Sequence, residues 1–293
     1  MIAAHTVRIR GVDLVYDVGG PLPPRDGAPS LLMIGQPMDA SGFAALASHF
    51  PDRTVVTYDP RGIGRSTRSD GRADHDPVVQ AEDLHQLIAE LGSGPVEMFA
   101  SSGGAVTALA LVAAHPEDIR VLVAHEPPLL GVLPDRDAAE RAMGRVLAAY
   151  QSGGPGAGMA AFIAMTSWPG EFTEEYLARP LPEPERYGMP AEDSGDRDDP
   201  LLSGRSTAVT AYLPDLAALA ASPTRIVIAV GEESAGRLAA RCAAVIAGRL
   251  HQEPAIFPSH HGGFVGGDHP FAGQPEAFAR RLRAVLSSGG SNR

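Results

Sequence analysis

The sequence predicts an α/β fold, with a mostly parallel central sheet flanked by helices and a helical cap inserted into it. Short β-branched runs alternate with longer Ala- and Leu-rich stretches of helical spacing, which is the order of parallel strands joined by crossover helices. The alternation stops after residue 128 and resumes at residue 223. Small residues, Ala100-Ser101-Ser102-Gly103-Gly104, stand where one predicted strand meets the next helix. One sheet with one insertion accommodates a chain of 293 residues.

The first half of the chain contains the opening strands and the first crossover helices. Apolar, β-branched runs predict strands at residues 7–10, 12–17, 31–34, 54–58 and 96–100. Apolar spacing predicts helices at residues 41–50 and 78–91. The strand at 96–100 leads through the small-residue turn into a helix that ends near residue 114.

The second half completes the sheet. A strand predicted at 120–125 ends at Glu126-Pro127-Pro128. After the insertion, the pattern predicts two strands and two helices, with the strands at 225–230 and 255–257 and the helices at 235–249 and 275–286. A loop containing His260 and His261 follows the last strand.

The insertion defines the expected domain organisation. We predict a core made of residues 1–128 and 223–293 and a helical cap made of residues 129–222. The cap region contains an amphipathic stretch at 137–150 and the helix breakers at 153–156. Residues 180–200 are rich in proline and acidic residues, which indicates an irregular loop. We expect the cap to determine substrate choice.

Composition and charge limit the possible partners. The 35 acidic and 24 basic residues give a formal net charge of −11, which disfavours nucleic acids and anionic membranes and favours a small, neutral or apolar substrate. Cys242 is the single cysteine, so no intrachain disulfide can form. The N-terminal residues lack the apolar run of a signal peptide, and no stretch is long and apolar enough to span a membrane. We therefore expect a cytoplasmic protein that acts either as a monomer or as a homo-oligomer.

Ser102 is the candidate nucleophile. A serine hydroxyl at a tight turn between a strand and a helix lies beside the next N–H group, which can stabilise an oxyanion. With Ser102 at the centre, Ala100 and Gly104 occupy the two outer positions of a Gly-x-Ser-x-Gly turn, alanine replacing the first glycine. With Ser101 at the centre, Phe99 would occupy a crowded position. The alternative is that both serines only cap the following helix.

Three motifs in this order resemble the α/β-hydrolase superfamily. They are the stretch Tyr58-Asp59-Pro60-Arg61-Gly62-Ile63-Gly64-Arg65-Ser66, the turn around Ser102, and the stretch Phe257-Pro258-Ser259-His260-His261-Gly262-Gly263-Phe264. The resemblance implies that a histidine after the last strand is the general base. The family's His-x-Gly-Phe ending selects His261, with His260 as a neighbour that lines the pocket.

The acid of the catalytic triad has two candidate positions. Members of the family usually place an aspartate soon after the penultimate strand, where this chain has Gly231-Glu232-Glu233-Ser234. Certain members, among them haloalkane dehalogenases, take the acid from the end of the strand after the nucleophile, and Glu126 stands there. Since Glu126 follows Ser102 by 24 residues, enough for one helix and one strand, we favour Glu126 over Glu232 and Glu233.

The oxyanion hole is expected to combine two backbone N–H groups. One belongs to Gly103. The other comes from the loop after the strand at 31–34, which reads Gly35-Gln36-Pro37. Because proline has no N–H group, Gln36 is the predicted donor, and Met38 and Asp39 then border the pocket.

A metal site is the competing interpretation of the C-terminal loop. His260, His261, Asp268 and His269 are residue types that bind zinc. No compact ligand-bearing helix accompanies them, and the resemblance already assigns His261, so we predict neither a metal nor a cofactor.

These residues predict a cofactor-independent serine hydrolase. Ser102 attacks an ester, lactone or related acyl bond, His261 transfers the proton, and water releases the acyl-enzyme. Similar proteins also include cofactor-free haloperoxidases and carbon–carbon bond hydrolases, whereas haloalkane dehalogenases and epoxide hydrolases use an aspartate in place of Ser102. A non-catalytic ligand-binding protein on the same fold is the alternative from another functional class.

Overall fold

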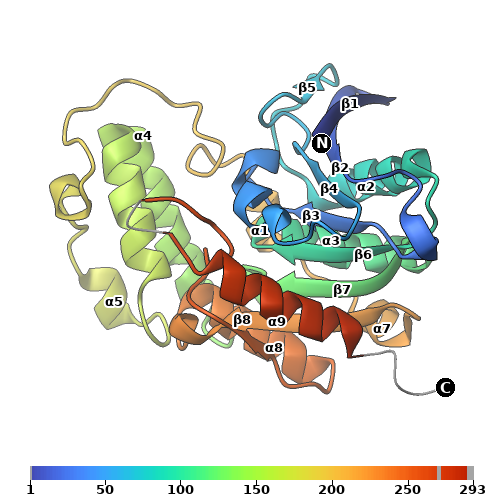
Figure 1. Ribbon diagram of the computed structural model, residues 1–293. Helices are drawn as coiled ribbons and strands as arrows, with labels where there is room; N and C mark the ends of the chain where they lie inside the picture. The colour runs from blue at the N-terminus through green and yellow to red at the C-terminus, as the bar shows by residue number, and fades with distance from the viewer. Residues whose placement is uncertain (1, 269–271, 289–293) are drawn as a thin grey trace.

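One sheet runs through the whole molecule. The computed structural model describes residues 2–268 and 272–288. The strand order is β1-β2-β4-β3-β6-β7-β8-β9, with the short strand β5 beside β2 (Figure 1). From β4 to β9 all neighbouring strands are parallel, whereas β2 is antiparallel to both β1 and β4. The predicted α/β fold with a mostly parallel sheet is confirmed.

The central strands are apolar because both of their faces are covered. Every residue of β3, β4 and β6 is buried. The strands are β1 (Ile2–Ile9), β2 (Val12–Gly19), β3 (Leu31–Ile34), β4 (Val55–Tyr58), β5 (Thr67–Arg68), β6 (Val96–Ser101), β7 (Ile119–His125), β8 (Arg225–Gly231) and β9 (Ala255–Phe257).

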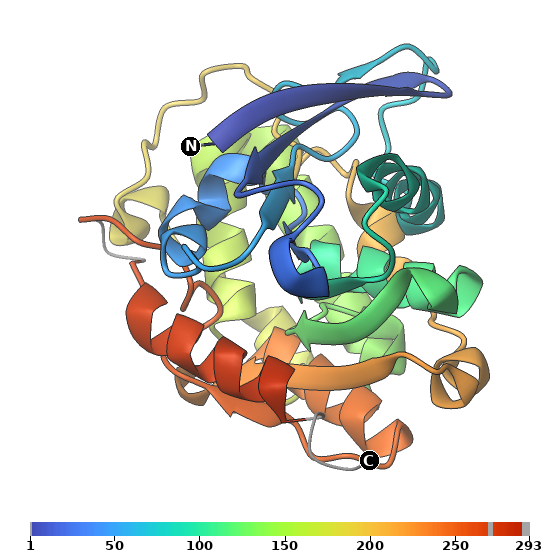
Figure 2. The same ribbon diagram turned by 45° about the vertical axis from the view of Figure 1, so that its right-hand side comes forward.

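Helices cover both faces of the sheet (Figures 1 and 2). They are α1 (Ala44–Ser48), α2 (Pro77–Leu91), α3 (Gly103–Ala114), α4 (Arg136–Thr166), α5 (Glu174–Ala178), α6 (Thr207–Ala211), α7 (Leu216–Ala221), α8 (Leu238–Arg249) and α9 (Pro275–Ser287). Short 3-10 helices include Ala40–Phe43, Pro116–Asp118 and Glu232–Ser234.

Alternation along β3 divides the core into two clusters. Leu31 and Met33 pack in one cluster with Phe43 and with residues of α9 such as Phe278. Leu32 and Ile34 belong to the other cluster, which contains the buried residues of α2, α3 and α8. Successive strand residues point to opposite faces of a sheet, so α1 and α9 cover one face and α2, α3 and α8 cover the other.

The insertion between β7 and β8 is helical and contains a long irregular stretch. It begins with α4, whose course bends at Gly154 (φ 79°) and Pro155. Together with α5 and the long loop after it, α4 stands at one end of the molecule (Figure 1). Residues 189–206 have no helix or strand, as the proline-rich composition predicts. The division into a core domain and a cap domain stays a prediction.

Three local features differ from the expected elements. β1 begins at Ile2, five residues before the predicted start, because its pairing with β2 continues along an exposed hairpin. The expected helix at 41–50 is a 3-10 helix followed by the short α1. The two-residue β5 was not predicted, since two residues make no periodic pattern.

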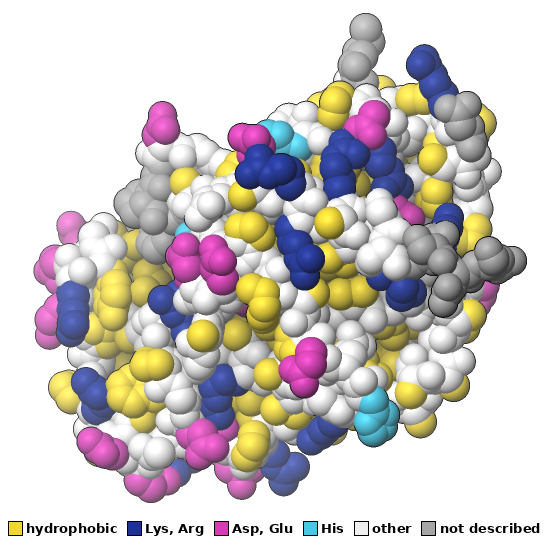
Figure 3. All heavy atoms as spheres, turned by 60° about the horizontal axis from the view of Figure 1, so that its bottom comes forward, with side chains coloured by type: hydrophobic (Ala, Val, Ile, Leu, Met, Phe, Trp, Pro, Cys, Tyr) yellow, Lys and Arg dark blue, Asp and Glu magenta, His cyan; other side chains and the backbone are white. Residues whose placement is uncertain are grey.

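Acidic and basic side chains are intermixed on one face of the molecule. On the face in Figure 3, acidic side chains alternate with arginines and apolar patches, so the net negative charge is not gathered in one region of that face. Within residues 2–268 and 272–288, no helix is both long enough and apolar enough to cross a membrane.

Candidate active site

Ser102 occupies a strained turn between β6 and α3. Its φ of 57° and ψ of −129° lie outside the regions that residues with a side chain normally adopt. Its N–H group donates to the carbonyl of His125 at 2.9 Å, and its carbonyl accepts from the N–H of Ala105 at 3.0 Å. Such strain persists where neighbouring contacts hold it, and it is frequent at functional sites.

The glycines after Ser102 allow α3 to approach the β3 loop. A Cβ atom on Gly103 would lie 2.8 Å from the carbonyl oxygen of Gln36, and one on Gly104 would lie 2.7 Å from the Cα of Gly35. Both distances are shorter than real Cβ contacts. Only glycine at 103 and 104 therefore permits this packing, which brings the two candidate oxyanion donors, Gln36 and Gly103, side by side.

His261 and Glu126 form a direct pair. Nδ1 of His261 lies 2.6 Å from Oε2 of Glu126. The other carboxylate oxygen, Oε1, accepts the N–H of Gly231 at 2.8 Å. The Glu126 side chain is 1% exposed and that of His261 is 46% exposed. One end of the pair is thus anchored inside the protein while the imidazole reaches solvent.

The environment keeps Glu126 ionised. Burial by itself raises the pKa of this carboxyl, but the hydrogen bond from His261, the charges of His261 and His125, and the N–H of Gly231 outweigh burial and lower the pKa to about 2. A carboxylate in this position fixes the imidazole tautomer with a proton on Nδ1, which leaves Nε2 as the acceptor.

The other two candidate acids, Glu232 and Glu233, contact Ser259 instead of His261. Glu232 accepts the N–H of Ser259 at 3.2 Å through its side chain, and the N–H of Glu233 donates to the carbonyl of Ser259. Both residues are exposed. Within the described part of the chain, Glu126 is the carboxylate in hydrogen-bond contact with His261.

The candidate residues lie at the same edge of the sheet. Ser102 follows β6 and Glu126 follows the adjacent β7, while His261 lies in the loop after β9. These strands are parallel, so their carboxyl ends lie at the same edge. Ligands of open α/β sheets bind beyond the carboxyl ends of the strands.

His125 is buried beneath this edge of the sheet. The sequence alone did not identify it as a residue of the site. Its ring lies 6.0 Å from that of His261, and its Nδ1 is 3.1 Å from the hydroxyl of Ser101. Burial lowers the pKa of His125 to about 4, although Glu126 acts in the opposite direction. The imidazole is therefore neutral at pH 7. The available signal was a polar residue at the end of an otherwise apolar strand.

Comparison with known proteins identifies the family. A family model for the alpha/beta hydrolase fold matches residues 31–156. An uncharacterized hydrolase of Bacillus subtilis (strain 168), YraK, is 30% identical over 269 residues, which make up 89% of this chain and 90% of that protein. The chain belongs to the α/β-hydrolase superfamily.

More distant relatives share parts of the sequence or only the fold. A proline iminopeptidase of Xylella fastidiosa (strain 9a5c) is 31% identical over 98 residues, 33% of this hydrolase and 31% of that protein. A thermophilic esterase from Thermogutta terrifontis superposes with a TM-score of 0.62 at 22% identity, covering 97% of this chain and 99% of the other. A putative epoxide hydrolase from Pseudomonas aeruginosa gives a TM-score of 0.66 at 18% identity, with 98% and 96% covered. At these identities the two structures establish the shared fold.

Gln36 brings a second buried polar group to the α/β-hydrolase site. It precedes a cis peptide bond to Pro37, and its residue is 3% exposed. Neither side-chain atom, Oε1 or Nε2, has a hydrogen-bond partner among the described residues. Buried amides normally find partners, so the Gln36 side chain is an exception among the described residues.

Among the described residues of the C-terminal loop, the metal donors suggested by the sequence do not form one cluster. Nδ1 of His260 accepts the N–H of Gly262 at 3.0 Å, and Nδ1 of His261 is bonded to Glu126. Asp268 is exposed, and His269 lies outside the described residues. Across residues 2–268 and 272–288, the one group of donors close enough to share a metal ion lies in a different place, at His85, His115 and Asp118.

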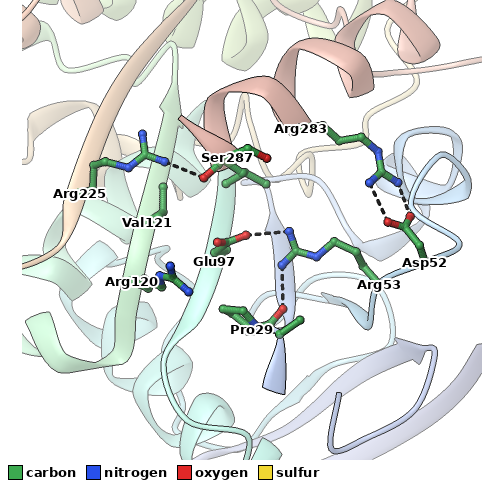
Figure 4. Close-up of a pocket in the computed structure, with 11 residues that line it drawn as sticks. Pro29, Asp52, Arg53, Glu97, Arg120, Val121, Arg225, Arg283 and Ser287 are labelled. Carbon is green, nitrogen blue, oxygen red and sulfur yellow. Dashed lines mark hydrogen bonds and ion pairs between the residues drawn. The ribbon is translucent and has the colours of Figure 1, made fainter. Parts of the chain in front are cut away.

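A cavity of about 520 Å³ lies away from this edge. Figure 4 shows Arg53, Glu97, Arg120 and Arg225 around it, with Arg53 paired to Glu97. Glu97 and Arg225 stand at the beginning of β6 and β8, so the cavity is at the amino ends of the strands. It therefore lies at the opposite end of the strands from Ser102.

Proposed function

We propose that the protein is a cofactor-independent serine hydrolase that cleaves an ester, lactone or related acyl bond of a small, mostly apolar substrate. The observation that carries the proposal is the contact between Nδ1 of His261 and the buried, ionised carboxylate of Glu126. This pair lies at the same sheet edge as the strained Ser102 turn. Serine, histidine and carboxylate in these places match the roles of a nucleophile, a base and an orienting acid.

Each residue has a defined task in the proposed reaction. Nε2 of His261 takes the proton of Ser102 as the hydroxyl oxygen attacks the acyl carbon. Glu126 stabilises the imidazolium that results, and the N–H groups of Gly103 and Gln36 donate to the oxyanion. His261 then protonates the leaving group. In the second half, His261 removes a proton from water as the water oxygen attacks the acyl carbon. His261 returns this proton to the Ser102 oxygen as the bond to the acyl group breaks, which releases the acid.

The test is hydrolysis of p-nitrophenyl esters of two to eight carbons by the wild-type protein and by Ser102→Ala. We expect turnover by the wild type and a loss of at least about a thousandfold in the variant. The preferred acyl length then describes the substrate pocket. Unchanged turnover in Ser102→Ala contradicts the serine mechanism.

A fluorophosphonate probe separates an enzyme from a binding protein of the same fold. The probe forms a covalent bond with an activated serine, so the wild type becomes labelled and Ser102→Ala does not. Ser101→Ala is the matched control, because its hydroxyl is adjacent but bonded to His125. Absence of labelling in a folded wild type, together with no ester turnover, supports the non-catalytic alternative.

A further inference from the structure

Two imidazole rings lie face to face on the surface formed by α2 and the end of α3. The rings of His85, on α2, and His115, directly after α3, have centroids 3.8 Å apart and planes inclined by 12°. Nδ1 of His85 is 2.7 Å from Oδ2 of Asp118. Nε2 of His115 is 3.2 Å from Oε2 of Glu82. Each imidazole therefore has a carboxylate oxygen at hydrogen-bond distance.

The donor atoms converge closely enough to hold one ion. One ligand atom from each of His85, His115 and Asp118 lies within 4.8 Å of the other two. Zinc bonds of 2.0–2.2 Å place tetrahedral ligands about 3.3–3.6 Å apart. The side chains are 12–32% exposed, so a tilt of the two rings away from their stacked arrangement closes the remaining gap.

The local charge favours a cation. Asp118, Glu82 and Glu117 surround the two rings, and the nearest oxygen of Glu117 is 3.9 Å from Nδ1 of His115. A divalent ion takes the place of protons between the imidazoles and the carboxylates and offsets this negative charge. Two protonated rings at 3.8 Å would instead repel each other.

We propose that His85, His115 and Asp118 form a binding site for a divalent transition-metal ion, best suited to Zn²⁺. Two imidazole nitrogens and carboxylate oxygens are donors that zinc accepts. A water molecule completes a tetrahedral zinc sphere around three protein ligands.

The position of the site indicates what the ion does. Glu82 and His85 belong to α2, whereas His115 and Asp118 belong to the link between α3 and β7. A bound ion joins these segments. His115 is at the other end of α3 from Ser102, about 18 Å away along a helix of 12 residues. The site is thus independent of the proposed ester chemistry.

The experiment titrates ZnCl₂ into the full-length protein, free of any affinity tag and stripped of metal with EDTA. Calorimetry is expected to give one Zn²⁺ per chain with a micromolar dissociation constant. Because the ion binds the folded state, excess Zn²⁺ raises the melting temperature by about 3–5 °C. Mg²⁺, which prefers oxygen ligands, produces no shift.

Matched variants locate the ion. His85→Ala and His115→Gln are expected to weaken Zn²⁺ binding at least thirtyfold and to remove the shift in melting temperature. Glu117→Gln removes a nearby charge without removing a proposed ligand, and His251→Asn removes an exposed imidazole elsewhere; both keep the affinity within about threefold. Circular dichroism and ester turnover report whether each variant is folded.

Two results overturn the proposal. One is that the wild type shows neither a heat of binding nor a shift in melting temperature when Zn²⁺ is in 100-fold excess over protein at about micromolar concentration. The other is equal Zn²⁺ binding in the wild type and in folded His85→Ala, which places the ion elsewhere. Neither result bears on the serine mechanism, which Ser102→Ala tests separately.

Discussion

Glu126 combines three features that the chemistry of an orienting acid requires. Its side chain is buried, it remains ionised, and both of its oxygens have partners, Gly231 on one side and His261 on the other. Its φ of 49° is rare for a residue with a side chain. The backbone therefore turns at Glu126 in a way that directs the carboxylate toward the loop after β9.

Replacing Glu126 by glutamine tests this role. An amide cannot stabilise the imidazolium and can present its NH₂ group to Nδ1, which favours the wrong tautomer. We expect kcat/KM for p-nitrophenyl butyrate to fall about 10³–10⁴-fold. The control Glu233→Gln, at an exposed position, should keep wild-type activity. The opposite pattern would assign the acid to the loop after β8.

His125 links acidity to folding stability. Its pKa is about 4 in the folded protein and 6.5 as the ordinary value, so the unfolded chain binds a proton that the folded protein does not bind between these pH values. The contribution of His125 to the free energy of unfolding is fully present above pH 6.5 and is lost as the pH falls toward 4. The loss amounts to about 3 kcal/mol.

His125→Phe is expected to flatten the dependence of urea unfolding on pH between 6.5 and 4. Ser101→Ala is the control, because it breaks the same hydrogen bond but keeps the titrating ring. Part of the slope remains in the variant, since burial also lowers the pKa of His75 to about 4. A slope unchanged in His125→Phe would show that His125 is not the group responsible.

At the scale of elements, the approach of α3 to the β3 loop depends on two glycines. Gly104→Ala places a methyl group against the backbone of Gly35, where no side-chain rotation relieves it. We expect a loss of about 2–4 kcal/mol in unfolding free energy and of most esterase activity. Chemical denaturation and ester turnover measure the two effects.

Gly144→Ala is the control for Gly104→Ala. Gly144 lies in α4, and a Cβ atom there meets nothing within 4 Å. Gly144→Ala is therefore expected to stabilise the protein by up to about 1 kcal/mol. If both variants behave alike, close packing at Gly104 is not the cause of its effect.

The elements also explain which features the sequence could predict. Strands such as β3 and β6 are apolar throughout because both faces are covered, so they are visible in the sequence. The turn at Ser102 and the loop with His261 carry motifs. His125 ends a strand and belongs to no motif. His85 and His115 are 30 positions apart, one on α2 and the other directly after α3, and only the packing of α2 on α3 brings them together.

The sequence shows that Glu126 stands at the end of the strand after Ser102, a position from which some members of the family take the acid. Sequence reasoning could place Glu126, Glu232 and Glu233 at the same edge of the sheet. It could not tell which carboxylate faces His261, because that depends on the conformation of single residues after each strand.

At the scale of the whole molecule, the net charge of −11 acts on charged substrates at long range. We expect kcat/KM for a p-nitrophenyl ester with a carboxylate at its far end to rise about two- to tenfold between about 0.02 M and 0.3 M NaCl, as salt screens the repulsion. The neutral ester of equal length should change little. An equal response of both esters would mean that the charge does not affect substrate approach.

The strained backbone at Ser102 has an evolutionary consequence. Glycine adopts positive φ without the cost that a side chain imposes, so the molecule would be more stable with glycine in place of Ser102, the proposed nucleophile. Serine at this position is retained only while natural selection acts on turnover. In a lineage that no longer needs the reaction, selection for stability alone would favour mutation of this codon to glycine, and Ser102 would be among the first residues of the site to disappear.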